Sequence, residues 1–85
     1  MLYQIEFSRL ADRQFRSLPS QIQQRLKSRI DALATTPRPH GSEKLSGQEQ
    51  FYRIRVGDYR IVYAVEDDRL LVLVVKVGHR REVYR

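Results

Sequence analysis

The chain has 85 residues, no cysteine, and 16 Lys and Arg against 10 Asp and Glu, which gives a formal net charge of +6. This length predicts one domain over residues 1–85 and excludes a large enclosed active-site cavity, so any chemistry belongs in a surface groove. Without cysteine there are no disulfides or thiolate metal sites, and the positive charge favours a polyanion or an acidic protein as partner. No signal peptide opens the chain, and its longest apolar run, residues 70–75, is too short to span a membrane. We therefore expect a cytoplasmic protein with no membrane partner.

A strand and two helices are predicted for the first part of the chain. Residues 2–7 alternate between apolar and polar side chains, which predicts a half-buried strand, and Ser8 is placed to cap a helix. Pro19 suits the first turn of a second helix, which ends at residues 35–37. The apolar stripes of the two helices are Leu10, Ala11, Phe15 and Leu18, then Ile22, Leu26, Ile30 and Leu33. We interpret Arg25 and Arg29 as solvated side chains that add at most unspecific phosphate contacts.

Two loops and a hairpin follow the helices. Residues 37–42 form a proline-rich connector in which His40 is interpreted as solvated or structural, and residues 43–47 are predicted to be a second loop, with Lys44 as a candidate RNA contact. Residues 50–65 form two alternating runs around Gly57-Asp58, which predicts a hairpin with a type II′ turn. This turn places Arg55 opposite Arg60 on the neighbouring strand.

The predicted hairpin has two unlike faces. One is apolar and suits a core: Tyr52, Ile54, Val56, Tyr59, Ile61 and Tyr63. The other carries Arg53, Arg55 and Arg60 with no acidic residue among them, although like charges opposite each other destabilise a sheet by up to about 1 kcal/mol. A guanidinium is a planar fork of donors that suits phosphate, so the hypothesis is that this face binds a nucleic-acid backbone. The alternative is a solvated face whose arginines splay apart.

A last strand is predicted for residues 70–77. It is apolar on both faces and therefore belongs in the middle of the sheet, and Gly78 ends it before a short basic tail. The resulting order β-α-α-β-β-β predicts an α+β fold, a small antiparallel-rich sheet with an N-terminal two-helix hairpin packed on one face. The arginines then lie on the open face.

Few residues of this chain are able to carry RNA chemistry. Paired carboxylates, metal-ligand spacings, glycine-rich phosphate loops and nucleophilic triads are all missing, so we expect no metal and no other cofactor. RNA supplies its own 2′-hydroxyl nucleophile, and an enzyme must hold the backbone in line, stabilise the added charge and move two protons. Arginines serve the first two needs, but a pKa above ~12 leaves no neutral base. Tyr84 and His79 are the candidates for proton transfer, and the alternatives are a packing aromatic and an exposed turn histidine.

Three segments resemble the RelE/ParE superfamily of toxin–antitoxin toxins, and the resemblance covers nearly the whole chain. They run from Glu43 to Gly47, from Phe51 to Tyr63 and from Val77 to Tyr84. The RelE branch is the more similar one, which implies a ribosome-dependent mRNA interferase that cuts by 2′-hydroxyl attack without a metal. Carried over by position, the resemblance implies site roles for Arg53, Arg55, Arg60, Arg80 and Tyr84. Arg81 and Lys44 are expected to contact RNA.

The resemblance also implies partners. These are a small cognate antitoxin that covers the arginine face with acidic groups or a helix, and the ribosome with mRNA in its A site. Some relatives carry lysines where this chain has Arg53 and Arg55, so a lysine base is missing here. Two alternatives are a ParE-like gyrase inhibitor, which shares the scaffold without cutting RNA, and a basic RNA-binding module without catalysis.

Overall fold

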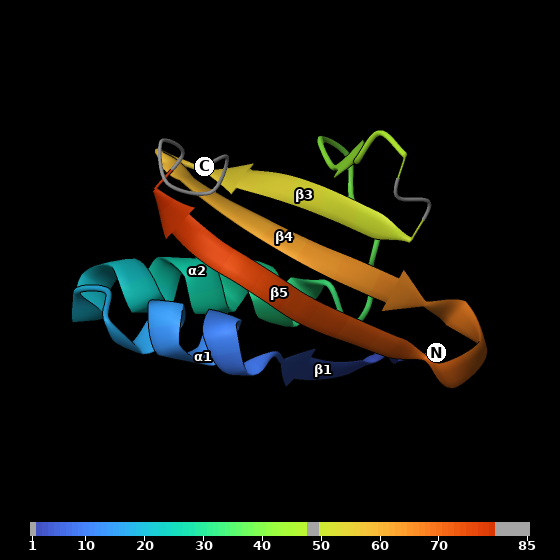
Figure 1. The fold of residues 1–85 in the computed structure, drawn as a ribbon, viewed down its shortest axis with the longest axis horizontal. Helices are drawn as coiled ribbons and strands as arrows, with labels where there is room; N and C mark the ends of the chain where they lie inside the picture. The colour runs from blue at the N-terminus through green and yellow to red at the C-terminus, as the bar shows by residue number, and fades with distance from the viewer. Residues whose placement is uncertain (1, 48–49, 80–85) are drawn as a thin grey trace.

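The computed structural model describes residues 2–47 and 50–79. Within these ranges it contains two α-helices, one 3-10 helix and a five-stranded sheet. In chain order the elements are β1 (Gln4–Phe7), α1 (Arg9–Arg16), α2 (Ser20–Ala32), β2 (Glu43–Lys44), β3 (Phe51–Val56), β4 (Tyr59–Glu66), η1 (Asp67–Arg69) and β5 (Leu71–His79). Both helices lie on the same face of the sheet, so the predicted α+β fold is confirmed (Figure 1).

The strands follow the order β1-β5-β4-β3-β2 across the sheet. The β1–β5 pair is parallel and the other pairs are antiparallel. β5 therefore lies inside the sheet, as its apolar sequence predicted. Several bounds differ from the prediction, since β1 begins at Gln4 instead of residue 2 and α2 ends at Ala32 instead of at residues 35–37. β5 continues through Gly78 to His79 because β4 still pairs with both residues, and residues 43–44 form the short edge strand β2 instead of a loop because they pair with β3.

The hairpin turn has the predicted geometry. Gly57 has a φ of +60°, and Leu70 is the only described non-glycine residue with a positive φ, so Asp58 has the negative φ that distinguishes a type II′ turn from type I′. The predicted register is confirmed by the pairing of Arg55 with Arg60. The positive φ of Gly57 favours glycine, and a Cβ added there would lie 3.2 Å from Nη2 of the exposed Arg25 side chain on α2, which would have to shift slightly.

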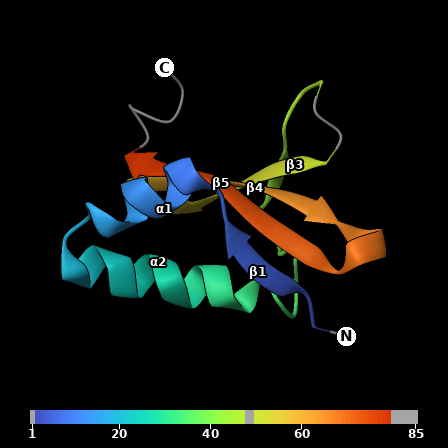
Figure 2. The same cartoon turned by 60° about the horizontal axis from the view of Figure 1, so that its bottom comes forward.

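The two helices contact different strands, since α1 packs on β5 and α2 contacts β3. Both helices lie on the same side of the sheet (Figure 2). Ser8 caps α1 as predicted, because its Oγ accepts a hydrogen bond from the Ala11 amide at 3.1 Å. Ala11 and Phe15 of α1 face the core, and so does Leu18, which follows the helix. Leu10 was predicted to face the core but is 45% exposed, since neighbouring residues of a helix point about 100° apart. None of the described helices is long and apolar enough to cross a membrane.

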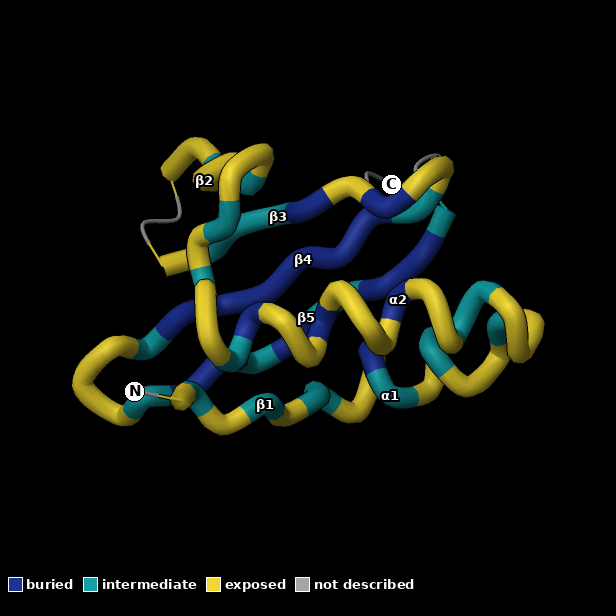
Figure 3. The backbone as a smooth tube through the Cα atoms, turned by 180° about the vertical axis from the view of Figure 1, so that it is seen from behind, coloured by how far each residue is buried: buried dark blue, intermediate teal, exposed yellow. Residues whose placement is uncertain are grey.

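The hydrophobic core lies between the helices and the sheet. The apolar face of the hairpin and the stripe of α2 meet there, as predicted, and the side chains involved are Tyr52, Ile54, Val56, Tyr59, Ile61, Tyr63, Ile22, Leu26, Ile30 and Leu33. β4 is buried from Arg60 to Val65, so the strand between β3 and β5 is enclosed along most of its length (Figure 3). The Tyr63 hydroxyl donates to the Pro37 carbonyl at 2.8 Å, and burial raises the pKa of Tyr63 to about 12.

An exposed cluster around Asp67 ties three distant segments together. Arg38 donates to the two carboxylate oxygens of Asp67 at 3.1 and 2.7 Å, and the Tyr3 hydroxyl donates to the same group at 2.5 Å. The Arg38 guanidinium also lies over the Tyr52 ring, 5.2 Å from its centroid. The hydrogen bonds from Arg38 and Tyr3 hold the pKa of Asp67 below its ordinary value. This cluster joins the start of the chain to the connector and to η1.

Candidate anion-binding site

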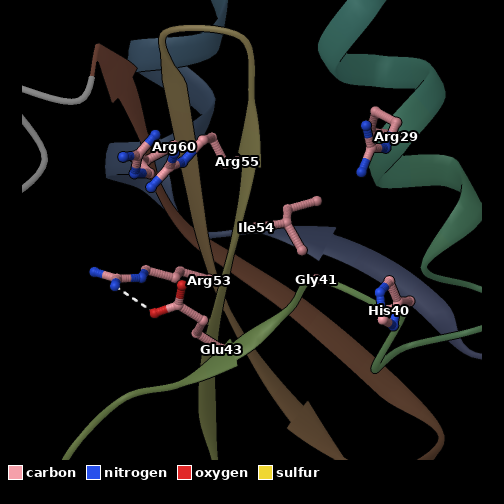
Figure 4. A pocket seen from close by; sticks show the side chains of 8 residues that line it. All are labelled: Arg29, His40, Gly41, Glu43, Arg53, Ile54, Arg55 and Arg60. Atoms are coloured by element: carbon pink, nitrogen blue, oxygen red, sulfur yellow. Dashed lines mark hydrogen bonds and ion pairs between the residues drawn. The ribbon is translucent and has the colours of Figure 1, made fainter.

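A hollow of about 360 Å³ opens beside β3, and we call it the arginine pocket. Its wall combines α2, the connector, β2 and both strands of the hairpin (Figure 4). The lining residues are Arg29, His40, Gly41, Glu43, Arg53, Ile54, Arg55 and Arg60. Half of these residues are arginines, so the pocket is strongly positive and suits an anion.

The hairpin register brings the three predicted arginines to one face of the sheet. Arg55 pairs directly with Arg60. Arg53 precedes Arg55 by two residues on β3, so its side chain points to the same side of the strand. Figure 4 shows the guanidiniums of Arg55 and Arg60 close together, with Ile54 pointing to the other side of the strand. The predicted geometry of the arginine face is therefore confirmed.

Arg60 differs from its neighbours because it is buried. It is only 7% exposed, and its Nη1 atom has no hydrogen-bond partner among the described residues. The burial follows from the sheet, since β4 is flanked on both sides and Arg60 lies between Arg55 and Gly78. A buried donor without a partner costs about 1–3 kcal/mol. An anion oxygen placed in the pocket would supply the missing acceptor.

An acidic residue lies among the hairpin arginines, so the prediction of a purely basic face was wrong. Glu43 of β2 pairs with Arg53 of β3, and Nη2 of Arg53 donates to its Oε2 at 2.5 Å. That hydrogen bond and the charge of Arg53 hold the pKa of Glu43 below its ordinary value, with smaller contributions from the charges of Arg55 and Arg60. Glu43 is therefore ionised at neutral pH. A two-residue strand has no alternation to reveal it, which is why the sequence did not show this contact.

The remaining predicted site residues are not brought into the pocket by the described structure. Lys44 is exposed on β2 and is not a lining residue. His79 pairs with Tyr59, and their ring centroids are 5.7 Å apart, so its ring lies on the apolar face of the sheet and not beside Arg60. Three further predicted residues lie outside the described ranges: Arg80, Arg81 and Tyr84.

Two lining residues were not predicted to take part in the site. Arg29 and His40, interpreted as solvated or structural, form the wall on the helix side of β3 (Figure 4). Only the packing of α2 beside β3 places Arg29 there, and the sequence periodicity of one helix carries no such information. Among residues 2–47 and 50–79, no three His, Cys, Asp or Glu side chains gather where they would hold a metal ion.

The fold and the pocket together define a class of protein, a small basic α+β domain with a cationic site on a hairpin. The family model described as the ParE toxin of type II toxin-antitoxin system, parDE, matches residues 5–84. The chain belongs to this toxin family, which confirms the superfamily resemblance seen in the sequence.

Several relatives carry the name RelE. The mRNA interferase toxin RelE of Escherichia coli K12 is 34% identical over 99% of this chain and 92% of its own length. A chain in the crystal structure of the intact E. coli RelBE toxin-antitoxin complex matches with a TM-score of 0.81 and 30% identity, covering 93% of this chain and 96% of that chain. A chain of the archaeal RelE-RelB complex from Pyrococcus horikoshii OT3 matches with a TM-score of 0.83 and 28% identity, covering 96% and 99%.

Proposed function

We propose that this protein is the toxin of a type II toxin-antitoxin system and cuts translated mRNA on the ribosome, with the arginine pocket holding the scissile phosphate. The observation that carries the proposal is Arg60, a buried residue beside Arg55 whose Nη1 atom has no hydrogen-bond partner in the part of the chain that the structure describes. Folding alone does not favour this arrangement, because the buried donor and the like-charge pair both cost stability. The proposal is supported by relatives named mRNA interferase.

The proposed reaction is an internal transfer on the RNA backbone. The 2′-oxygen attacks the adjacent phosphorus, and the bond from phosphorus to the 5′-oxygen of the next nucleotide breaks. The products are a 2′,3′-cyclic phosphate and a free 5′-hydroxyl. A base takes the proton of the 2′-hydroxyl, and an acid returns one to the leaving 5′-oxygen.

The arginines would act on the charge of the phosphorane. Arg60 and Arg55, which both line the pocket, would donate to its non-bridging oxygens, and one donor aimed at developing negative charge is worth about 10²–10³-fold in rate. Guanidiniums meet this charge without a metal ion. Proton transfer stays assigned to Tyr84 by prediction, and Arg80 is predicted to add a further cation.

Dependence on the ribosome is part of the proposal. The lining residues Arg29, Glu43 and Arg55 are exposed, and a surface site of this kind orders a flexible single strand poorly, so we expect the surface that holds the mRNA to impose the in-line geometry. The A site of a translating ribosome supplies such a surface. Purified protein is expected to cut naked RNA slowly or not at all.

A cognate antitoxin is the second proposed partner. The solved complexes of relatives contain RelE together with RelB. We propose that the antitoxin of this chain brings acidic side chains or a helix to the open face, where it neutralises the arginines.

A second candidate function is inhibition of DNA gyrase, the activity expected of a ParE-like toxin. It is favoured by the description of the matching family model, which names the ParE toxin. One experiment separates the two functions. The protein is induced in cells, new mRNA 5′ ends are mapped, and gyrase-linked double-strand breaks are measured in parallel. Fresh cuts within translated frames that vanish in Arg60→Gln support the interferase, whereas trapped gyrase without new mRNA ends supports the gyrase inhibitor.

A further inference from the structure

The arginine pocket contains a carboxylate that the proposed reaction does not use. Glu43 is the single acidic residue among the described lining residues, and it stands on β2 directly opposite Arg53. Figure 4 shows its carboxylate turned toward the Arg53 guanidinium, on the same side of the hairpin as Arg55 and Arg60. It therefore lies on the face that a phosphate would approach.

The ion pair is exposed enough to exchange partners. The Glu43 side chain is 56% exposed and the Arg53 side chain 29%, and an exposed ion pair contributes only about 0–1 kcal/mol. A phosphate carries the same charge as the carboxylate and presents the same planar pattern of acceptors to a guanidinium. A phosphate at Arg53 would thus replace the carboxylate at small cost to the fold.

We propose that Glu43 is a built-in competitor of phosphate, which occupies the Arg53 guanidinium in the free toxin and is displaced when the RNA backbone binds. Arg53 is then the cation for which carboxylate and phosphate compete, while Nη1 of Arg60, which no described residue accepts from, stays available to the substrate. Glu43 is a specificity-determining residue in this role and takes no part in the bond-making step.

The competition has a functional consequence that rests on the proposed function. Glu43 lowers the affinity of the pocket for any RNA strand that diffuses in, because its carboxylate must leave Arg53 before the phosphate is fully bound. A strand that the ribosome already holds in place needs less affinity from the toxin. Glu43 would therefore keep the toxin off free RNA and direct it to mRNA on ribosomes.

Binding to an uncleavable strand tests this inference directly. The probe is a fluorescein-labelled ten-nucleotide 2′-O-methyl RNA, and fluorescence anisotropy gives its Kd for the whole protein over a range of KCl concentrations. Glu43→Gln is expected to tighten binding about threefold at low salt, the effect of removing one unit charge ~6 Å away in water. The slope of log K against log salt is expected to steepen by up to about 0.7, because one more phosphate contact releases its counterion.

Asp31→Asn is the matched control. Asp31 is 58% exposed and forms an ion pair with Lys27 at 2.8 Å on α2, so its loss changes the net charge and breaks an ion pair just as Glu43→Gln does. It is not a lining residue of the arginine pocket, and its slope is expected to equal that of the wild type. Glu43→Asp retains the charge and is expected to keep the wild-type slope. Thermal melts verify that each variant is folded.

Three results decide the inference. Tighter binding with a steeper slope for Glu43→Gln alone supports competition. Equal gains for Glu43→Gln and Asp31→Asn overturn it, because net charge then explains both. Weaker binding of Glu43→Gln also overturns it, since Glu43 would then hold Arg53 in place for the phosphate. The binding experiment has no cleavage readout, so its result does not depend on the proposed function. If the variants bind as expected but the wild-type toxin does not cut mRNA on ribosomes, the proposed function is refuted and the competition between Glu43 and phosphate still holds.

Discussion

Replacing Arg60 with Met should make the protein more stable while abolishing its proposed activity. Arg60 is 7% exposed, its Nη1 atom has no partner among the described residues, and the residue pairs with Arg55. Methionine is unbranched, flexible and apolar, so it replaces the aliphatic stem of the arginine without a buried charge. Buried ionic groups are often replaced by apolar ones of similar volume at no cost or with a gain in stability.

The size of the gain follows from the contacts that Arg60 lacks. A buried unsatisfied donor costs about 1–3 kcal/mol, and relief of the like-charge pair adds a few tenths more. For a domain of this length 1 kcal/mol shifts Tm by about 4–8 °C, so Arg60→Met is expected to raise Tm by roughly 5–25 °C. Thermal unfolding followed by circular dichroism at neutral pH measures the shift.

Arg55→Met is the control for this experiment. It removes the same like-charge pair, but Arg55 is exposed and leaves no buried donor behind, so its effect is expected to stay within about 0.5 kcal/mol. A lower Tm for Arg60→Met than for the wild type would refute the reasoning, because it would mean that the guanidinium stabilises the fold.

Three further substitutions test separate parts of the structure. Asp67→Asn should lower Tm at neutral pH because it breaks the ion pair with Arg38. Because the pKa of Asp67 is lowered in the folded protein, the Tm difference from wild type is largest above about pH 4 and fades as pH falls through the folded pKa. Thermal melts at several pH values measure this. Gly57→Ala should cost more than about 1 kcal/mol in urea unfolding, because alanine is strained at a φ of +60°; an unchanged midpoint would contradict the turn. His79→Gln should lose about 0.5–1.5 kcal/mol with its ring contact to Tyr59 while cleavage continues, whereas a proton-transfer role would cost about 10²–10⁴-fold in rate.

The sequence predicted the parts of the fold that depend on local pattern. Alternation on both sides of Gly57 fixed the hairpin, and the pairing of Arg55 with Arg60 followed from counting outward from the turn. The apolar stretch of residues 70–77 predicted an interior strand because neither of its faces suits water. These features need no knowledge of distant residues.

The parts that were missed depend on contacts between distant segments. β2 is two residues long and exists because β3 offers it an edge, so Glu43 looked like a loop residue. The burial of Arg60 comes from strands on both of its sides, and a charged residue in an alternating run gives no sign of enclosure. Arg29 enters the site only through the packing of α2. The sequence therefore predicted which arginines of the hairpin share one face, but not their pairing with Glu43 or the burial of Arg60.

The most direct test of the proposed function is cleavage of mRNA on purified ribosomes under single-turnover conditions. Arg60→Gln is compared with Arg16→Gln, which removes an exposed arginine of α1 that pairs with Asp12 outside the pocket. The account predicts a 2′,3′-cyclic phosphate product, a rate lower by about 10²–10³-fold for Arg60→Gln and a wild-type rate for Arg16→Gln. Cleavage by Arg60→Gln at the wild-type rate would contradict it.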